Sequence, residues 1–297
     1  MQGQILHIAP TPLANTTRPT FATVLLIGLS LSSLSSTSFA PGPSQKTVEA
    51  FDRYVQTAEA REHEERASQR DFLWIDQLPD QERERNYAAL KQGQAVIRSL
   101  QSCEPRCAAA SGGLIHAWVR IVFVPGVSLR ETIATLQDYD RDADYYQPQV
   151  VRSRLLARSG NDFRVFLRLK QTYGITVVMD TEYQVHYSPL DGRRAASQSH
   201  STRINEVENA GLPSERIRPV GDDHGFLWRL YSYWHFYEAD GGVYIQCNAI
   251  SLTRDVPPGL GWLVGPFIEI IPRESLQFTL DATRKALLDK FQHRNKS

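Results

Sequence analysis

Hydrophobic and polar residues alternate along much of the chain after residue 113, and this period of two predicts β-strands. The first predicted strand covers residues 114–123, where alternate positions are all hydrophobic and share one face. Six further strand-like runs follow between residues 150 and 249, and Asp191 with Gly192 predicts a tight hairpin turn between two of them. Sequential strands joined by short turns predict an antiparallel sheet of seven strands.

Two helices are predicted to accompany this sheet. Ser128 and Glu131 have the spacing of a capping box, which predicts a helix that ends near Asp140. After Pro272, which suits the first turn of a helix, a stripe recurs at helical spacing. The stripe consists of Leu276, Leu280, Thr283, Leu287 and Phe291. A helix of about 20 residues is roughly 30 Å long, so we expect an α+β fold in which a curved sheet surrounds a long C-terminal helix.

Residues 41–110 are predicted to form a helical N-terminal extension. Hydrophobic residues recur at helical spacing from residue 48 to residue 58, whereas residues 59–71 are almost all charged and are expected to face solvent. A second helix is expected at residues 80–92, and Gly93 is placed to end it.

A hydrophobic knot, defined as residues 72–75, lies between these two helices. Four consecutive apolar side chains must be buried, so we expect the knot to dock on the main domain. Tyr231, Tyr233 and Tyr237 share one face of a predicted strand, and we expect the knot to cover part of that face.

The first 40 residues have the pattern of a secretory signal peptide. An apolar run at residues 21–34 follows Arg18 and precedes a stretch of small residues that ends at Ala40. About 14 apolar residues are too few to cross a bilayer but suit the centre of a signal peptide. We therefore expect an exported protein, periplasmic or secreted. The alternative is an uncleaved anchor, which would be the only source of membrane contact.

Cysteine usage fits an oxidising compartment. Cys103 and Cys107 flank a short segment in which Pro105 forces a turn, so we expect them to form a disulfide. Cys247 lies among apolar residues in a predicted strand and is expected to be a small buried hydrophobe. A zinc site would need two further ligands at a recognisable spacing, and His116 alone does not supply them.

Four acidic residues at alternate positions raise the question of calcium binding. They are Asp138, Asp140, Asp142 and Asp144. The glycine and the closing glutamate of an EF-hand loop are missing, so a solvated acidic helix end is the better interpretation. No metal site and no other cofactor are predicted.

The predicted strand at residues 193–206 is unusually polar, and it decides what the interior of the fold can hold. Its alternate positions Ala195, Ser197, Ser199 and Ser201 are small, and the strand that follows it carries bulky side chains. Small residues that face large ones give either an interlocked core or a hollow lined by hydroxyl groups. We expect the hollow.

A Pro- and Gly-rich stretch at residues 256–271 precedes the C-terminal helix. Long loops inside compact domains are often lids or binding elements, so we expect Trp262 and Phe267 to form a lid over the hollow.

Charge argues against nucleic acid as a partner. The chain has 33 Lys and Arg residues and 33 Asp and Glu residues, so its formal net charge is zero. A protein with no net positive charge has no summed field that attracts phosphate backbones.

The order of elements resembles the helix-grip fold of the START-like (SRPBCC) superfamily, and residues 111–297 are the expected domain. Two stretches, GFLWRL at residues 225–230 and SLTRD at residues 251–255, look like segments of uncharacterised exported bacterial members. The superfamily includes lipid-transfer domains and polyketide cyclases. The resemblance implies a site for a lipid or another hydrophobic small molecule between the sheet and the C-terminal helix. It supplies no shared catalytic motif.

Ten residues are candidates for contact with such a ligand. Polar selectivity would come from Tyr183, Ser197, Ser199 and Ser201. Wall candidates are Trp228, Trp234, Phe236 and Phe278, and lid candidates are Trp262 and Phe267. For each aromatic residue, a place in an ordinary core is the alternative.

Two other functions remain open. A polyketide cyclase or dehydratase-like enzyme would need a titratable group inside the hollow. The alternation puts Asp180, Glu182, His186 and His235 on the opposite, solvated face, and the side on which His200 lies is undetermined. No catalytic residue is therefore predicted. The third function is an interaction module with a filled core. The oligomeric state is not predicted.

Overall fold

The computed structural model describes residues 42–68, 70–100, 108–109, 112–173, 175–219, 221–255 and 261–294. The predicted signal peptide at residues 1–40 and the predicted Cys103–Cys107 disulfide lie outside these residues, so both stay predictions. Within the described ranges, no helix combines the length and the hydrophobicity that a membrane span requires.

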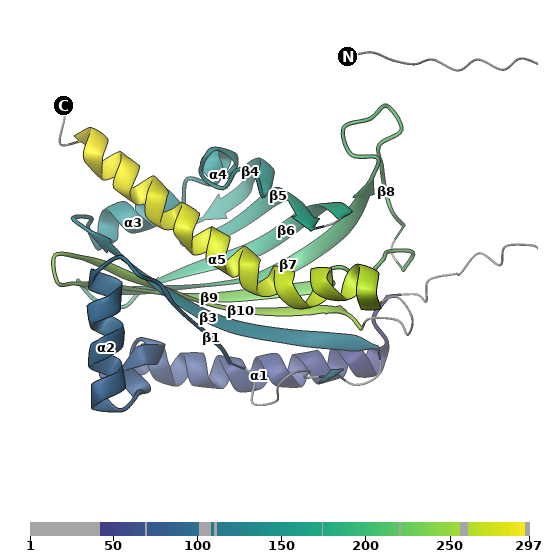
Figure 1. Cartoon of the computed structure of the whole chain (residues 1–297). Helices are drawn as coiled ribbons and strands as arrows, with labels where there is room; N and C mark the ends of the chain where they lie inside the picture. The colour runs from purple at the N-terminus through teal and green to yellow at the C-terminus, as the bar shows by residue number, and fades with distance from the viewer. Residues whose placement is uncertain are drawn as a thin grey trace, which may run out of the picture. The chain divides into compact units, whose positions relative to one another are not determined.

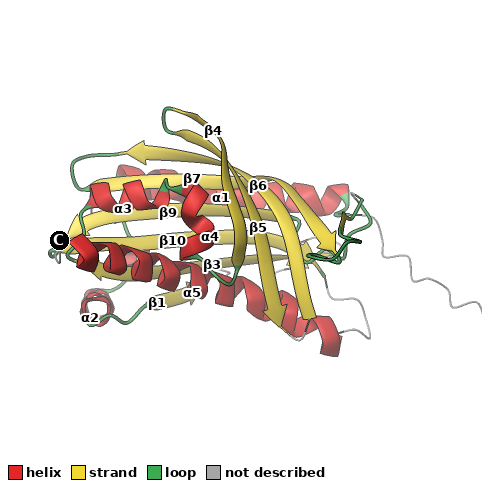
Figure 2. Cartoon of the chain, turned by 90° about the horizontal axis from the view of Figure 1, so that it is seen from above, coloured by secondary structure: helices red, strands yellow, loops and turns green. Residues whose placement is uncertain are grey.

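A curved antiparallel sheet forms the centre of the fold (Figures 1 and 2). Its strands follow the order β1-β3-β10-β9-β7-β6-β5-β4, and short strands β2 and β8 pair with β3 and β7. The strands are β1 (Val96–Ser99), β2 (Ala108–Ala109), β3 (Gly113–Pro125), β4 (Val150–Ser159), β5 (Asp162–Tyr173), β6 (Ile175–Pro189), β7 (Arg194–Glu208), β8 (Arg216–Ile217), β9 (Arg229–Ala239) and β10 (Gly242–Arg254). All seven predicted strands are present, and three short strands that were not predicted, β1, β2 and β8, join them.

Helices cover both faces of the sheet. The helices are α1 (Gln45–Ala67), η1 (Trp74–Gln77), α2 (Asp80–Lys91), α3 (Leu129–Leu136), η2 (Tyr139–Arg141), α4 (Asp142–Tyr145) and α5 (Gly261–Arg294). Figure 1 shows α5 along one face and α1 with α2 along the other. We call these the inner face and the outer face.

Helix α5 is fixed to the inner face by a hydrophobic stripe and by polar contacts at its side. Leu276, Leu280 and Leu287 are buried against residues of β3, β9 and β10, as the sequence stripe predicted. Arg120 of β3 donates to Asp281 at 2.6 Å, and Arg284 donates to the carbonyl oxygen of Phe123 at 3.0 Å. Because the stripe covers only part of the sheet, room is left beside α5.

On the outer face, the N-terminal extension packs as a continuous layer. Phe51 of α1 is fully buried and meets Tyr231 edge to face, with 5.5 Å between ring centroids. The knot docks beside it, as predicted, because Phe72 contacts Tyr237 at a centroid distance of 6.4 Å and Leu73 and Ile75 are fully buried.

Two predictions about helices are wrong. Residues 59–71 are not simply solvated, because α1 runs to Ala67 and buries Glu62 and Glu65. The C-terminal helix begins at Gly261 rather than at Pro272, so most of the Pro- and Gly-rich stretch is helical. Proline inside a helix removes one hydrogen bond, and Pro272, with Ile271, lies half-buried on the wall of the interior cavity.

Candidate functional site

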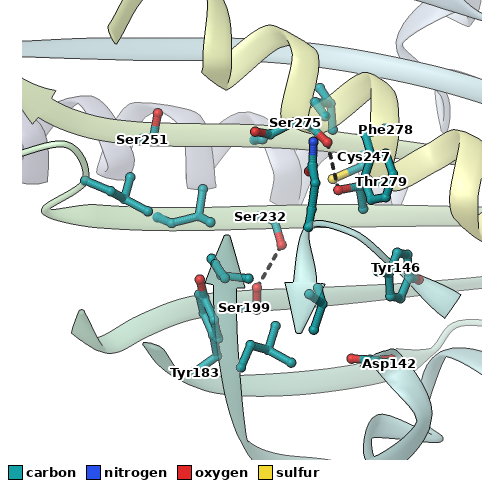
Figure 3. Close-up of a pocket in the computed structure, with 18 of the residues that line it drawn as sticks. Asp142, Tyr146, Tyr183, Ser199, Ser232, Cys247, Ser251, Ser275, Phe278 and Thr279 are labelled. Atoms are coloured by element: carbon teal, nitrogen blue, oxygen red, sulfur yellow. Dashed lines mark hydrogen bonds between the residues drawn. The ribbon is translucent and has the colours of Figure 1, made fainter. Parts of the chain in front are cut away.

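A cavity of about 300 Å³ lies between α5 and the inner face of the sheet (Figure 3). Ligand pockets commonly enclose about 300–1,000 Å³, so the cavity has room for one small hydrophobic molecule. Hydrophobic side chains make up most of its wall. They include Trp118, Val165, Leu167, Leu169, Met179, Val185, Leu230, Trp234, Phe236, Ala249, Leu276 and Phe278. The predicted hollow is therefore present.

The cavity exists because β7 presents small side chains to the interior. Ser197 and Ser199 line it, and their cross-strand neighbours on β9 are Trp234 and Ser232. The hydroxyl groups of Ser199 and Ser232 are 2.7 Å apart and bond to each other. Neither side chain reaches far enough from the sheet to fill the space below α5, so that space stays open.

Other hydroxyl groups lie around the same wall. The Ser251 Oγ atom on β10 is buried and has no hydrogen-bond partner among the described residues. Burial raises the pKa of Tyr183 to about 12, so its hydroxyl is neutral at physiological pH. Figure 3 shows these groups at separate positions around the cavity, and the wall between them is mainly apolar.

Six of the ten predicted ligand residues line the cavity. They are Tyr183, Ser197, Ser199, Trp234, Phe236 and Phe278. Trp262 and Phe267 lie in α5 rather than in a loop, and their side chains are outside the described part of the chain. The role of each residue in binding stays a prediction.

Ser201 and Trp228 are not on the cavity wall. Ser201 pairs with Tyr183 on β6, and its hydroxyl accepts a hydrogen bond from the Leu230 amide at 3.0 Å. Trp228 precedes β9, so the alternation of that strand does not extend to it. Its indole donates to Asp223 at 2.9 Å and packs with the α1 cluster on the outer face.

Asp142 is a titratable wall residue that the sequence interpretation missed. It was expected to be solvated, but it is only 7% exposed and lines the cavity. Burial, and then the charges of Asp138 and Asp140, raise the pKa of Asp142 well above its ordinary value. No hydrogen bond to its carboxyl group is seen among the described residues, so burial favours the protonated form of this acid. Nearby, the Tyr146 hydroxyl lies 2.9 Å from that of Thr283.

Two of the groups expected to be solvated are buried on the outer side. Asp180 forms a two-pronged ion pair with Arg168, with distances of 2.7 and 2.8 Å. His235 is 1% exposed and lies beside Glu62 and Glu65 under α1. His200 stacks on Tyr231, which places it on the outer face as well. None of these three residues lines the cavity.

Comparison with known proteins finds likeness in structure. No protein-family model and no curated protein matches the chain. A STAR-related lipid transfer protein from Xanthomonas axonopodis is 16% identical, with a TM-score of 0.43, over 64% of this chain and 98% of that one. Human STARD10 is 13% identical, with a TM-score of 0.40, over 74% and 84% of the two chains.

An aromatase/cyclase, Zhui from Streptomyces, is also similar. It is 13% identical, with a TM-score of 0.38, over 61% of this chain and 95% of that one. The curved antiparallel sheet around a long C-terminal helix is the helix-grip arrangement that the sequence predicted. At these identities and TM-scores the likeness carries no conclusion about ligand or activity.

Proposed function

We propose that this protein binds a lipid or another hydrophobic small molecule in the cavity between the sheet and α5. The observation that carries the proposal is the cavity itself, whose walls are mostly apolar and which has a few hydroxyl groups and one buried carboxyl group. Burial of apolar ligand surface is worth about 25 cal/mol per Å² before the costs of ordering are subtracted. The alternative of an interaction module requires a filled core, and the core of this fold contains a cavity instead.

The size of the cavity limits the ligand. About 300 Å³ suits one acyl chain or one compact ring system rather than a lipid with two long chains. The ligand would carry a hydroxyl or carbonyl group, because Ser199 and Ser251 are the kind of neutral polar groups that fix the orientation of such a ligand.

The proposal is tested by titration of the full chain with a fluorescent fatty acid. Ala249 lies on the cavity wall between its cross-strand neighbours Trp118 and Ser232. Ala249→Phe should therefore occupy the space and weaken binding by at least tenfold. Ala210→Phe, in an exposed turn, is the matched control and should bind like the wild type. Equal affinities of the wild type and Ala249→Phe would count against the cavity as the site.

Export is part of the proposal. It is supported by the apolar run at residues 21–34 and by the small residues that follow it. N-terminal sequencing of the protein recovered from producing cells tests it. A mature chain that starts near residue 41 in the extracytoplasmic fraction is expected, and an intact chain in the cytoplasm would contradict export.

A second candidate function is that of a cyclase or dehydratase-like enzyme, and Asp142 is the observation that favours it. A carboxylic acid that is neutral in an apolar cavity can give a proton to a bound ligand and take one back. If this is the function, the molecule extracted from Asp142→Asn should differ in mass from that of the wild type, for example by one water. An identical molecule from both proteins favours binding without chemistry.

A further inference from the structure

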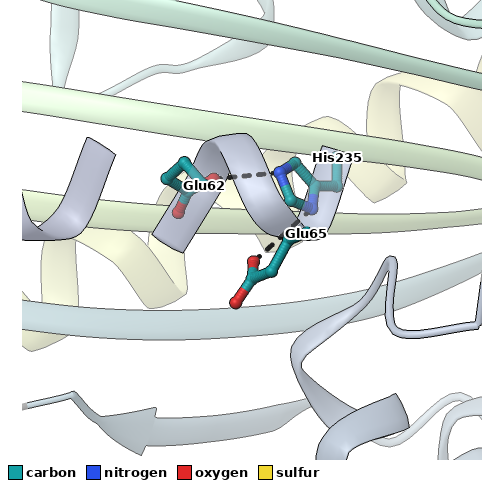
Figure 4. A group of neighbouring side chains, drawn as sticks. All are labelled: Glu62, Glu65 and His235. Atoms are coloured by element: carbon teal, nitrogen blue, oxygen red, sulfur yellow. Dashed lines mark ion pairs between the residues drawn. The ribbon is translucent and has the colours of Figure 1, made fainter. Parts of the chain in front are cut away.

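Three titratable side chains meet on the outer face of the sheet, and none of them lines the cavity on the inner face (Figure 4). Glu62 and Glu65 lie three positions apart on α1, so they project from the same side of the helix. His235 comes from β9 and faces them. Their exposed fractions are 3%, 4% and 1%, and one ligand atom from each lies within 4.8 Å of the others.

The imidazole of His235 is held in one orientation. Its Nδ1 atom donates to the carbonyl oxygen of Phe72 at 2.7 Å, a bond that leaves the lone pair of Nε2 free in the neutral ring. That Nε2 atom faces the Oε2 atom of Glu62 at 2.9 Å. Two atoms that both carry lone pairs approach this closely only when a cation or a proton lies between them.

One oxygen of each carboxylate, Oε1, already accepts a hydrogen bond. Asn248 donates to Glu62 Oε1, and Gln77 donates to Glu65 Oε1 at 2.8 Å. The other three atoms, both Oε2 atoms and His235 Nε2, are buried and have no hydrogen-bond partner among the described residues. His235 is also the only ion-pair partner of either carboxylate within those residues.

We propose that Glu62, Glu65 and His235 bind a divalent transition-metal ion of the zinc class, which fastens α1 to the sheet. Imidazole and carboxylate groups are common zinc ligands. A dication would balance the two buried carboxylates while His235 stays neutral. The hydrogen bonds from His235 to Phe72, from Gln77 and from Asn248 are the contacts that orient ligands around a metal. This site is on the outer face and does not depend on the cavity.

A proton between Glu62 and His235 is the competing explanation. It would satisfy that pair, but it would leave Glu65 Oε2 as a buried oxygen without a partner. Glu65 Oε2 lies 4.0 Å from Nδ1 of the His235 ring, and a metal ion bound by Glu62 Oε2 and His235 Nε2 would give Glu65 Oε2 a partner too. The two explanations differ in what added zinc does.

The test is a zinc titration of the full chain after removal of metals with a chelator. One Zn²⁺ per chain is expected, with a rise in Tm of about 5–10 °C when zinc is about 100 times the Kd. Glu65→Gln, which keeps the shape of the side chain, should lower zinc affinity at least tenfold. Glu64→Gln changes an exposed neighbour on the same helix and should bind zinc like the wild type.

X-ray absorption of the zinc-loaded protein gives a second measurement. Nitrogen and oxygen ligands with one imidazole are expected, and sulfur ligands would place the metal at the cysteines instead. The proposal is overturned if the wild type binds no zinc and its Tm does not change, or if Glu65→Gln and Glu64→Gln bind zinc equally well. The wild-type titration is decisive even if Glu65→Gln fails to fold, which circular dichroism would reveal.

Discussion

At the scale of single residues, Asp142 shows how burial changes the chemistry of a carboxyl group. Its side chain has lost water and faces apolar cavity walls, with two other acidic residues nearby. All three effects favour the protonated form. The raised pKa of Asp142 therefore makes the free energy of unfolding depend on pH, because the folded chain holds this proton more tightly than the unfolded chain does.

We predict that Asp142→Asn is more stable than the wild type at pH 8 and equal to it near pH 4. The folded pKa lies above the unfolded value of about 3.9, so the wild type loses stability as the pH rises through that interval, whereas asparagine does not titrate. A pKa raised by one unit is equivalent to about 1.4 kcal/mol. Urea unfolding at several pH values measures the difference.

The exposed Asp144 supplies the control for this experiment. Asp144→Asn removes a carboxyl group that pairs with Arg141 at the surface, so it should change stability by less than about 1 kcal/mol at every pH. If Asp142→Asn instead loses the same stability at pH 4 and at pH 8, the folded state does not raise the pKa of the Asp142 carboxyl group.

Residue patterns identified part of the site but not its acid. Ser197 and Ser199 could be found because small side chains on a strand cannot fill an interior. Asp142 could not, since its neighbours in sequence are also acidic and only the fold turns this one inward. Glu62 and Glu65 were missed for a similar reason, because their partner His235 is far away in the sequence.

At the scale of elements, the outer layer is as important to the fold as the C-terminal helix. Strand β3 is buried on both faces, by α5 on one side and by α1 and the knot on the other. Its nearly continuous hydrophobic sequence is typical of a strand covered on both faces. This explains why one face of residues 114–123 could be identified from alternation while the cavity residue Trp118 on its other face was missed.

We predict that Phe51→Ala destabilises the protein by about 3–5 kcal/mol, since Phe51 is fully buried between α1 and the sheet and its loss leaves a void. Asp52→Ala, at the exposed neighbouring position, should change stability by less than about 0.5 kcal/mol. Urea unfolding followed by tryptophan fluorescence measures both. A similar, small effect of the two substitutions would mean that α1 does not stabilise the sheet.

The helical elements were harder to predict than the strands. The amphipathic stripe of α5 correctly placed Leu280 and Leu287 on the sheet, but the glycines and prolines before it obscured eleven residues of helix, 261–271. In the extension, β1 is only four residues long and half-buried, so its alternation is too short to be distinguished from a loop. Both errors arise where burial by distant elements overrides local preference.

At the scale of the whole domain, one sheet separates two kinds of contact. On its outer face the extension packs tightly and buries a polar cluster, and on its inner face α5 leaves a cavity. The order of the strands and the long final helix were predictable from the sequence, because each pattern is local. The volume of the cavity was not, since it depends on how side chains from eleven helices and strands meet.

The most direct test of ligand binding is native mass spectrometry of the full chain after incubation with a total lipid extract and repurification. We predict a species heavier than the bare chain by the mass of one small hydrophobic molecule, which organic extraction removes. The same treatment of Ala249→Phe should yield the bare chain alone. A wild type that keeps the mass of the bare chain, or an adduct that Ala249→Phe retains in equal amount, would contradict the proposal that the cavity holds a ligand.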